Sequence, residues 1–135
     1  MSTERTSDDP APPAPRPLGL ALKRGWRRQC PNCGGGGMMD GYLTVRDRCV
    51  VCGAELFHHR ADDMPAWGTI LIVGHVIAPA MLTVYDLWDP PLWVHWTLWP
   101  LLALALTLAL LPRVKGMVVA YQWAHRMGGF ETAAR

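Results

Sequence analysis

The chain has 135 residues and a net charge of +2, so it has room for one small domain, and its overall charge alone indicates no class of partner. Half of the residues are hydrophobic and 18% are charged, but the apolar residues are concentrated between Pro65 and Leu111. This segregation leaves too few apolar residues elsewhere for an ordinary soluble core and is typical of a membrane protein.

The N-terminal segment, residues 1–22, is rich in proline and poor in large apolar side chains. Acidic residues stand where a signal peptide would be basic, and no apolar stretch follows them, so we expect the segment to be retained. It cannot bury enough surface to offset the entropy lost on ordering, which predicts a disordered tail.

A basic cluster, KRGWRR at residues 23–28, follows the tail and surrounds Trp26. One interpretation is a solvated linker. The other is a contact with anionic lipid headgroups, to which each basic residue would contribute about 1 kcal/mol.

All four cysteines fall in one pattern, in which two Cys-x-x-Cys pairs, each followed by glycine, have fifteen residues between the second cysteine of one and the first of the other. Two residues between cysteines let one tight turn present both sulfurs to a single ion, and Zn²⁺ takes four thiolates tetrahedrally. Gly34 and Gly53 allow the chain to curl so that backbone amides face the thiolates. The pattern predicts a zinc-ribbon-like module within residues 23–64, stabilised by metal instead of a hydrophobic core. Its predicted ligands are Cys30, Cys33, Cys49 and Cys52.

Within this module, Asp40-Gly41 predicts a turn and residues 42–45 a short strand. Iron in a rubredoxin-like site uses the same four ligands and stays open as an alternative. Disulfides are disfavoured in a reducing cytoplasm, and a thioredoxin-like redox pair would need a βαβ context. Arg46 and Arg48 are too few basic residues to indicate a nucleic-acid partner.

Residues 65–111 are predicted to form a two-helix transmembrane hairpin. Its apolar segments, 66–85 and 91–111, would each be about 30 Å long as helices, enough to cross the hydrocarbon core. A short acidic turn joins them and makes them antiparallel neighbours. Two buried helices of a soluble fold are the alternative, but nothing else in the chain could cover them. The 13 Lys and Arg residues all flank the hairpin, which predicts a bacterial inner-membrane protein with both termini cytoplasmic.

After the hairpin, residues 112–135 mix apolar and basic side chains and are predicted to be a cytoplasmic tail. The first interpretation is an amphipathic helix on the inner membrane surface, ended by Gly128-Gly129. The alternative is a partly helical tail packed on the cysteine module.

The juncture between module and hairpin, residues 58–65, is unusually polar. Asp62 or Asp63 is expected to cap the first membrane helix, with Pro65 in its first turn. His75 lies near the middle of that helix, where ionisable groups are costly. His75 is expected to hydrogen-bond to Thr97 or Thr107 of the second helix or to a partner protein. The alternative is that His75 is a cofactor ligand or part of a proton relay. The possible polar partner site comprises His59, Arg60, Asp62, Asp63 and His75.

These motifs together resemble an uncharacterised family of short bacterial membrane proteins, domain-of-unknown-function family nine-eight-three, found mainly in alphaproteobacteria. The resemblance runs from about Arg24 to Gly129. Met64 stands where the family usually has glycine, and Met38-Met39 replace a usual Leu-Phe. The family implies a membrane protein with a zinc-ribbon-like head and supplies no activity. The motifs that carry the resemblance are CPNCG, DGYLTV, RDRCVVCG, FHHRADDMPA and VGHVIAP.

The sequence therefore favours a non-enzymatic accessory or assembly protein that docks a larger membrane complex, for example a respiratory one, through its hairpin and zinc head. No small-molecule substrate is indicated. The alternative is a metal- or redox-handling protein that uses the four cysteines. A weaker third possibility is an enzyme acting on lipid through His59, Asp62 and Asp63.

Overall fold

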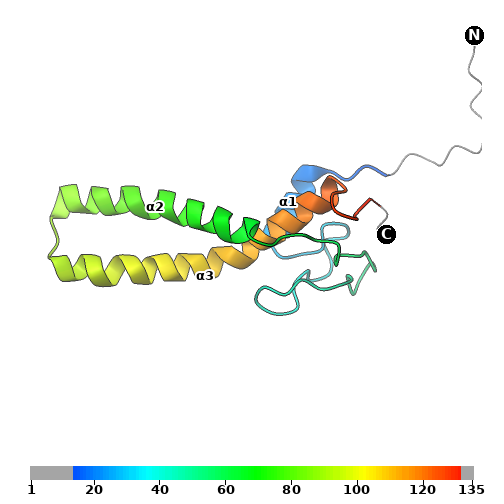
Figure 1. The fold of residues 1–135 in the computed structure, drawn as a ribbon, viewed down its shortest axis with the longest axis horizontal. Coiled ribbons are helices and arrows are strands. Elements are labelled where there is room, and N and C mark those ends of the chain that lie inside the picture. The colour runs from blue at the N-terminus through cyan, green and yellow to red at the C-terminus, as the bar shows by residue number, and fades with distance from the viewer. Residues whose placement is uncertain (1–13, 132–135) are drawn as a thin grey trace, which may run out of the picture.

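The computed structural model describes residues 14–131, which form three helices and a set of connecting loops (Figure 1). The helices are α1 (Leu18–Trp26), α2 (Met64–Trp88) and α3 (Leu92–Ala124). Helices α2 and α3 lie side by side as a long antiparallel hairpin, and α1 crosses the far end of α3. We call the compact end, formed by residues 14–63 and 112–131, the head.

Both hairpin helices are long and apolar enough to cross a membrane. Only 6% of the apolar window of each helix is buried, so most of these side chains are exposed on the outside of the hairpin. Both predicted segments are helical, but the first helix is longer than the predicted 66–85, since α2 begins at Met64 and continues to Trp88. The turn that joins α2 to α3 is three residues long, and Asp89 adopts a left-handed conformation there (φ 40°).

Helix α3 does not end with the apolar segment but continues through Pro112 into the head. Its last turns bury Val119, Ala120 and Trp123 against the head rather than against a membrane surface. Residues 112–124 are therefore helical, as predicted, and they pack on the head, as the alternative of a tail packed on the cysteine module expected. A position of this helix on the membrane surface stays a prediction. The helix ends at Ala124, before Gly128-Gly129, and residues 132–135 of the predicted tail lie outside the described residues.

Pro112 is accommodated because another group replaces its missing amide. A proline inside a helix leaves the carbonyl four residues earlier without its usual donor. The hydroxyl of Tyr42, which belongs to a loop of the head, donates a hydrogen bond to the carbonyl of Leu108. This bond fastens the cysteine module to the hairpin.

The predicted disordered tail also needs correction at its C-terminal end. Residues 1–13 lie outside the described residues, but α1 begins at Leu18 instead of leaving the chain irregular to residue 22. The reason is packing. Gly25 meets Gly116 of α3 so closely that a Cβ on Gly25 would lie 2.5 Å from the Gly116 carbonyl oxygen.

The core of the head lies between α1, the end of α3 and the cysteine loops. Among the described residues there is no extended strand, only isolated bridges such as Met39–Val45, so the strand predicted at 42–45 is wrong. The Asp40-Gly41 turn is present, with the amide of Asp40 donating to the Thr44 carbonyl (2.7 Å). Loops this short are held by side-chain packing and by the cysteine cluster rather than by the hydrogen-bond ladder of a β-sheet. The core residues are Ala21, Met38, Val45, Leu56, Ala61, Val119, Ala120, Trp123 and Phe130.

Candidate metal centre

The two cysteine pairs form matching turns. The amide of Gly34 donates to the Cys30 carbonyl (2.8 Å), and the amide of Gly53 donates to the Cys49 carbonyl (2.9 Å). Both glycines have a left-handed backbone, with φ of 70° and 72°. A side chain would strain this conformation, which explains why glycine follows each pair.

The four sulfur atoms gather at one point, all within 4.8 Å of one another. The Cys30–Cys52 and Cys33–Cys49 sulfurs are each 3.7 Å apart, far beyond the roughly 2.05 Å of a disulfide. A tetrahedral ion with metal–sulfur bonds of about 2.3 Å would place its sulfurs about 3.8 Å apart. The cysteines are therefore arranged to bind a metal ion, and their spacing fits a tetrahedral thiolate site.

The surroundings of the sulfurs differ from one side of the cluster to the other. Cys30 and Cys49 are buried, whereas Cys33 and Cys52 are half-buried. The side-chain amide of Asn32 points to the Cys52 sulfur (3.6 Å), and the Gly35 amide points to the Cys33 sulfur (3.4 Å). Such N–H groups favour thiolate over thiol.

These surroundings act in opposite directions on two of the thiols. Burial raises the pKa of the Cys30 thiol far above its usual range. For Cys33, burial acts upward too, but the amides of Gly35 and Gly36 outweigh it and lower the pKa of the thiol to about 7. A bound cation would keep the thiolate form of every ligand.

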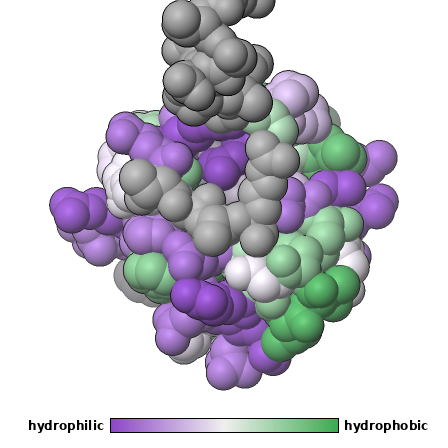
Figure 2. Space-filling model, turned by 90° about the vertical axis from the view of Figure 1, so that its right-hand side faces the viewer, coloured by the Kyte–Doolittle hydropathy of each residue, from purple (hydrophilic) through white to green (hydrophobic). Residues whose placement is uncertain are grey.

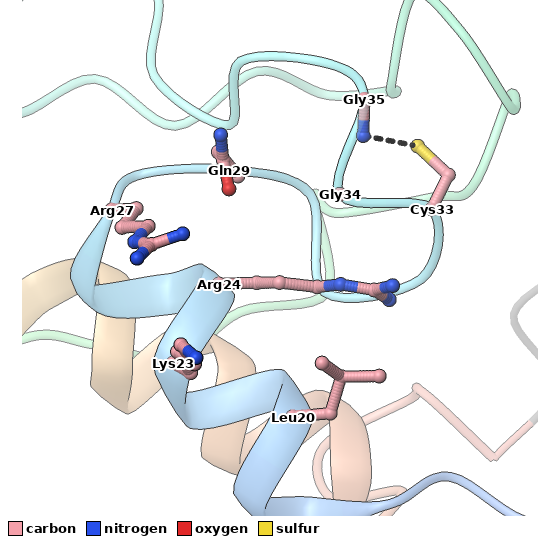
Figure 3. Close-up of a pocket in the computed structure, with 8 residues that line it drawn as sticks. All are labelled: Leu20, Lys23, Arg24, Arg27, Gln29, Cys33, Gly34 and Gly35. Atoms are coloured by element: carbon pink, nitrogen blue, oxygen red, sulfur yellow. Dashed lines mark hydrogen bonds between the residues drawn. The ribbon is translucent and has the colours of Figure 1, made fainter.

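Arg24 of α1 holds the first cysteine turn from outside. Its guanidinium donates to the carbonyls of Pro31 (3.0 Å) and Asn32 (2.6 Å). Figure 3 shows the Arg24 side chain reaching from the helix to the Cys33–Gly35 turn. The glycine at position 34 leaves room for the Arg24 side chain, because a Cβ there would lie 2.7 Å from Arg24 Nε. Sequence reasoning placed Arg24 only in a basic cluster and missed this role.

Arg24→Met should loosen the first cysteine turn. Two hydrogen bonds from a charged donor would be lost, each of a kind that contributes about 1.5–3 kcal/mol. We expect metal transfer to a colorimetric chelator to become at least roughly tenfold faster. Arg28→Met is the matched control because Arg28 is exposed. Equal transfer rates for wild type and Arg24→Met would show that the turn holds its shape without this side chain.

The polar juncture does not form a second ion site. Asp62 and Asp63 are exposed. Asp63 occupies the N-cap position of α2 and Pro65 lies in the first turn, as predicted, but the Asp63 side chain makes no capping hydrogen bond. His59 donates through Nδ1 to the Leu56 carbonyl (2.9 Å). Among the described residues, the four cysteines are the group of His, Cys, Asp and Glu placed to share a metal ion.

Arg60 instead shows how the juncture is fixed to α3. Its backbone amide donates to Gln122 Oε1 (2.9 Å), and Gln122 Nε2 donates to its carbonyl (2.6 Å). The side-chain amide of Gln122 thus exchanges two hydrogen bonds with the backbone of Arg60, as a paired residue on a neighbouring β-strand would. The sequence carried no signal for this contact between residues 62 positions apart.

His75 is not part of this juncture, since it lies about 18 Å further along α2 than Asp63. It is exposed, and its Nδ1 donates to the Leu71 carbonyl (2.8 Å) of its own helix. The hydroxyls of Thr97 and Thr107 also bond within their helix, so the predicted bond across the hairpin is wrong. A carbonyl only accepts, so Nδ1 carries the proton of a neutral ring and Nε2 is a free acceptor.

Comparison with known proteins supplies the family. Residues 39–123 match the family described as "Protein of unknown function (DUF983)". The chain belongs to the DUF983 family. The match confirms the resemblance seen in the sequence motifs and covers Cys49, Cys52 and both helices of the hairpin, but it begins after Cys30 and Cys33. For this DUF983 protein, no curated protein and no solved structure matches.

Proposed function

We propose that this DUF983 protein is a non-enzymatic accessory or assembly protein of the bacterial inner membrane. In this proposal the hairpin crosses the bilayer and docks a larger membrane complex, such as a respiratory one. The head, stabilised by Zn²⁺, receives a cytoplasmic partner. The observation that carries the proposal is an apolar hairpin that is exposed on its outside and presents unsatisfied hydrogen-bond acceptors around His75.

The metal part of the proposal is supported by the chemistry of the ligands. Four thiolates at tetrahedral spacing form a closed shell, which is typical of structural zinc and leaves no position for a substrate. Cys30, Cys49 and Ala54 form a small buried cluster around the sulfurs. Iron would use the same ligands, and metal analysis of the purified protein distinguishes the two.

The proposed orientation places both termini in the cytoplasm. The last turn of α2 and the turn that follows it contain Asp86 and Asp89 but no Lys or Arg, whereas the head carries basic residues on both sides of the hairpin. A tag at either terminus that reacts with an impermeant reagent outside intact cells would contradict this orientation.

The docking surface of the hairpin is the outer face of α2 around His75. A shallow apolar cavity of about 400 Å³ includes Gly74, His75, Ala78 and Pro79. Pro79 leaves the carbonyl of His75 without its helical donor, so this face presents two acceptors, that carbonyl and His75 Nε2. Lipid tails offer no donor, whereas small residues let another helix approach closely. The face therefore suits a transmembrane helix with a hydroxyl, amide or indole donor.

The test compares two substitutions at His75 in native membranes. Glutamine keeps an acceptor near the position of Nε2, and leucine removes it. With a photo-crosslinker at Ala78, we expect one partner whose crosslink falls about tenfold in His75→Leu and is largely kept in His75→Gln. A crosslinker at Leu104, on the exposed side of α3, is the control. Equal yields for both His75 variants, or a partner found equally at Leu104, would contradict docking through this face.

The alternative function is metal or redox handling by the four cysteines. It is favoured by Cys33, which is half-buried and has a thiol pKa lowered to about 7, as exchangeable or reactive cysteines do. It requires metal that exchanges rapidly or thiols that titrate reversibly. Metal that stays bound through a chelator challenge would leave only the structural role.

A further inference from the structure

Helix α1 lies between two hollows of opposite character. On one side, an apolar groove of about 590 Å³ is lined by residues of all three helices. On the other side, a basic cleft of about 330 Å³ lies between α1 and the first cysteine turn (Figure 3). The groove residues used below are Leu22, Trp26, Met64, Val114, Met117 and Tyr121.

The basic cleft has two uncommitted cations. Its lining includes Lys23, Arg24 and Arg27 and no carboxylate. Arg24 is occupied by the carbonyls of the cysteine turn. Lys23 on α1 and Arg27 at its C-cap are exposed, and the sticks in Figure 3 show neither bonded to another lining residue. Since they are four residues apart, they project from the same face of the helix and are available to one anion.

The apolar groove lies where the hairpin meets the head. Met64 begins α2, and Val114 follows the apolar part of α3, so the groove continues the exposed apolar surface of the hairpin into the head. Trp26 and Tyr121 also line it, and such aromatic side chains favour the level of lipid headgroups. Figure 2, which views the head end, shows green apolar residues gathered beside purple polar ones.

We propose that α1 binds one anionic phospholipid. The phosphate group contacts Lys23 and Arg27, and one acyl chain lies in the apolar groove against Leu22, Trp26 and Met117. The side chains of Lys23 and Trp26 are neighbours on the same helix, so the charged and apolar parts of one lipid reach both hollows. Asp62 and Asp63, which precede Met64, line neither hollow and do not oppose the phosphate there. This inference rests on the proposed membrane location of the hairpin.

The site also has a consequence for the metal centre. Helix α1, which carries Lys23 and ends just before Arg27, also carries Arg24, which holds the Cys30–Cys33 turn. A lipid bound to α1 therefore fixes the first cysteine turn to the membrane surface.

The test is native mass spectrometry of the full, metal-loaded chain released from detergent micelles. The micelles contain equal amounts of phosphatidylglycerol and phosphatidylcholine with identical acyl chains. We expect one retained phosphatidylglycerol per chain, preferred about twenty-five-fold if each of the two cations contributes the roughly fivefold typical of a basic residue near anionic lipid. The double variant Lys23→Gln, Arg27→Gln should bring the ratio near one, whereas Arg28→Gln should leave it unchanged.

The acyl chain is tested separately. Met117→Trp fills the groove and should reduce retention of both lipids about tenfold, with Leu104→Trp on the exposed hairpin as the matched control. Leu22→Gln, which adds no bulk, gives the same test if the tryptophan variant loses its metal.

Three results would overturn the lipid site: equal retention of both lipids by wild type, displacement by inorganic phosphate at equal concentration, or a bound protein in place of lipid. Each can occur in a chain that is membrane-embedded and metal-loaded, so failure here is distinct from failure of the proposed function.

Discussion

Replacement of Cys30 by serine is expected to abolish stoichiometric metal binding. Cys30 is fully buried and supplies one of four ligands, so the variant keeps three thiolates around a buried hydroxyl. Structural zinc in small domains contributes roughly 10–16 kcal/mol to folding, and the cysteine loops have little apolar core of their own. We expect the metal content to fall to roughly a tenth or less, and the loops of residues 27–63 to lose their fixed arrangement.

The measurement is metal content per chain by elemental analysis after purification in detergent. His58→Gln and His59→Gln are the controls, because both histidines lie near the module but outside the sulfur cluster. Both should keep about one metal ion per chain. Full metal content in Cys30→Ser, or loss of metal in a histidine variant, would mean that the ligand set differs from the four cysteines.

Gly116→Ala is expected to detach α1 from α3. A Cβ on Gly116 would lie 2.2 Å from the Gly25 carbonyl oxygen, and a backbone atom cannot move aside as a flexible side chain does. Overpacking of a tight contact usually costs about 1–3 kcal/mol, and we expect the upper part of this range. The amides of α1 should then exchange with solvent more than about a hundredfold faster, because α1 has lost its packing partner.

Hydrogen exchange of α1, followed by mass spectrometry, measures this effect directly. Gly19→Ala is the control within the same helix, since a Cβ there meets nothing within 4 Å. It should slow exchange, because alanine favours helix over glycine by up to about 1 kcal/mol. If Gly116→Ala and Gly19→Ala exchange alike, the crossing of α1 over α3 is looser than the glycine contact indicates.

Local sequence patterns predicted the parts of this protein that depend on local chemistry. The two Cys-x-x-Cys-Gly motifs required the turns that bring the sulfurs together, and the structure places the four sulfurs within one shell. Hydropathy alone located both hairpin helices, because length and apolar composition decide whether a segment can cross a bilayer.

The errors concern features that depend on tertiary contacts. A nine-residue helix such as α1 is marginal by itself, and it exists because Gly25 meets Gly116, 91 positions away, which no local pattern reveals. Pro112 appeared to end a helix, but Tyr42 supplies the donor that the proline lacks. His75 was expected to face the second helix, whereas its ring bonds to its own helix on the outer face of α2.

In the proposed membrane location of the hairpin, the hydrogen bond between Tyr42 and Leu108 would help to set the distance between the cysteine cluster and the bilayer. Pro112 determines which carbonyl of α3 lacks a helical donor and can accept from Tyr42. The position of that carbonyl in turn fixes the position of the Asp40–Thr44 turn, which contains Tyr42. A proline one helical turn later in the chain would move the acceptor by about 5.4 Å along the axis. Related chains that differ in the place of this proline would therefore hold their cysteine loops at different heights along the hairpin.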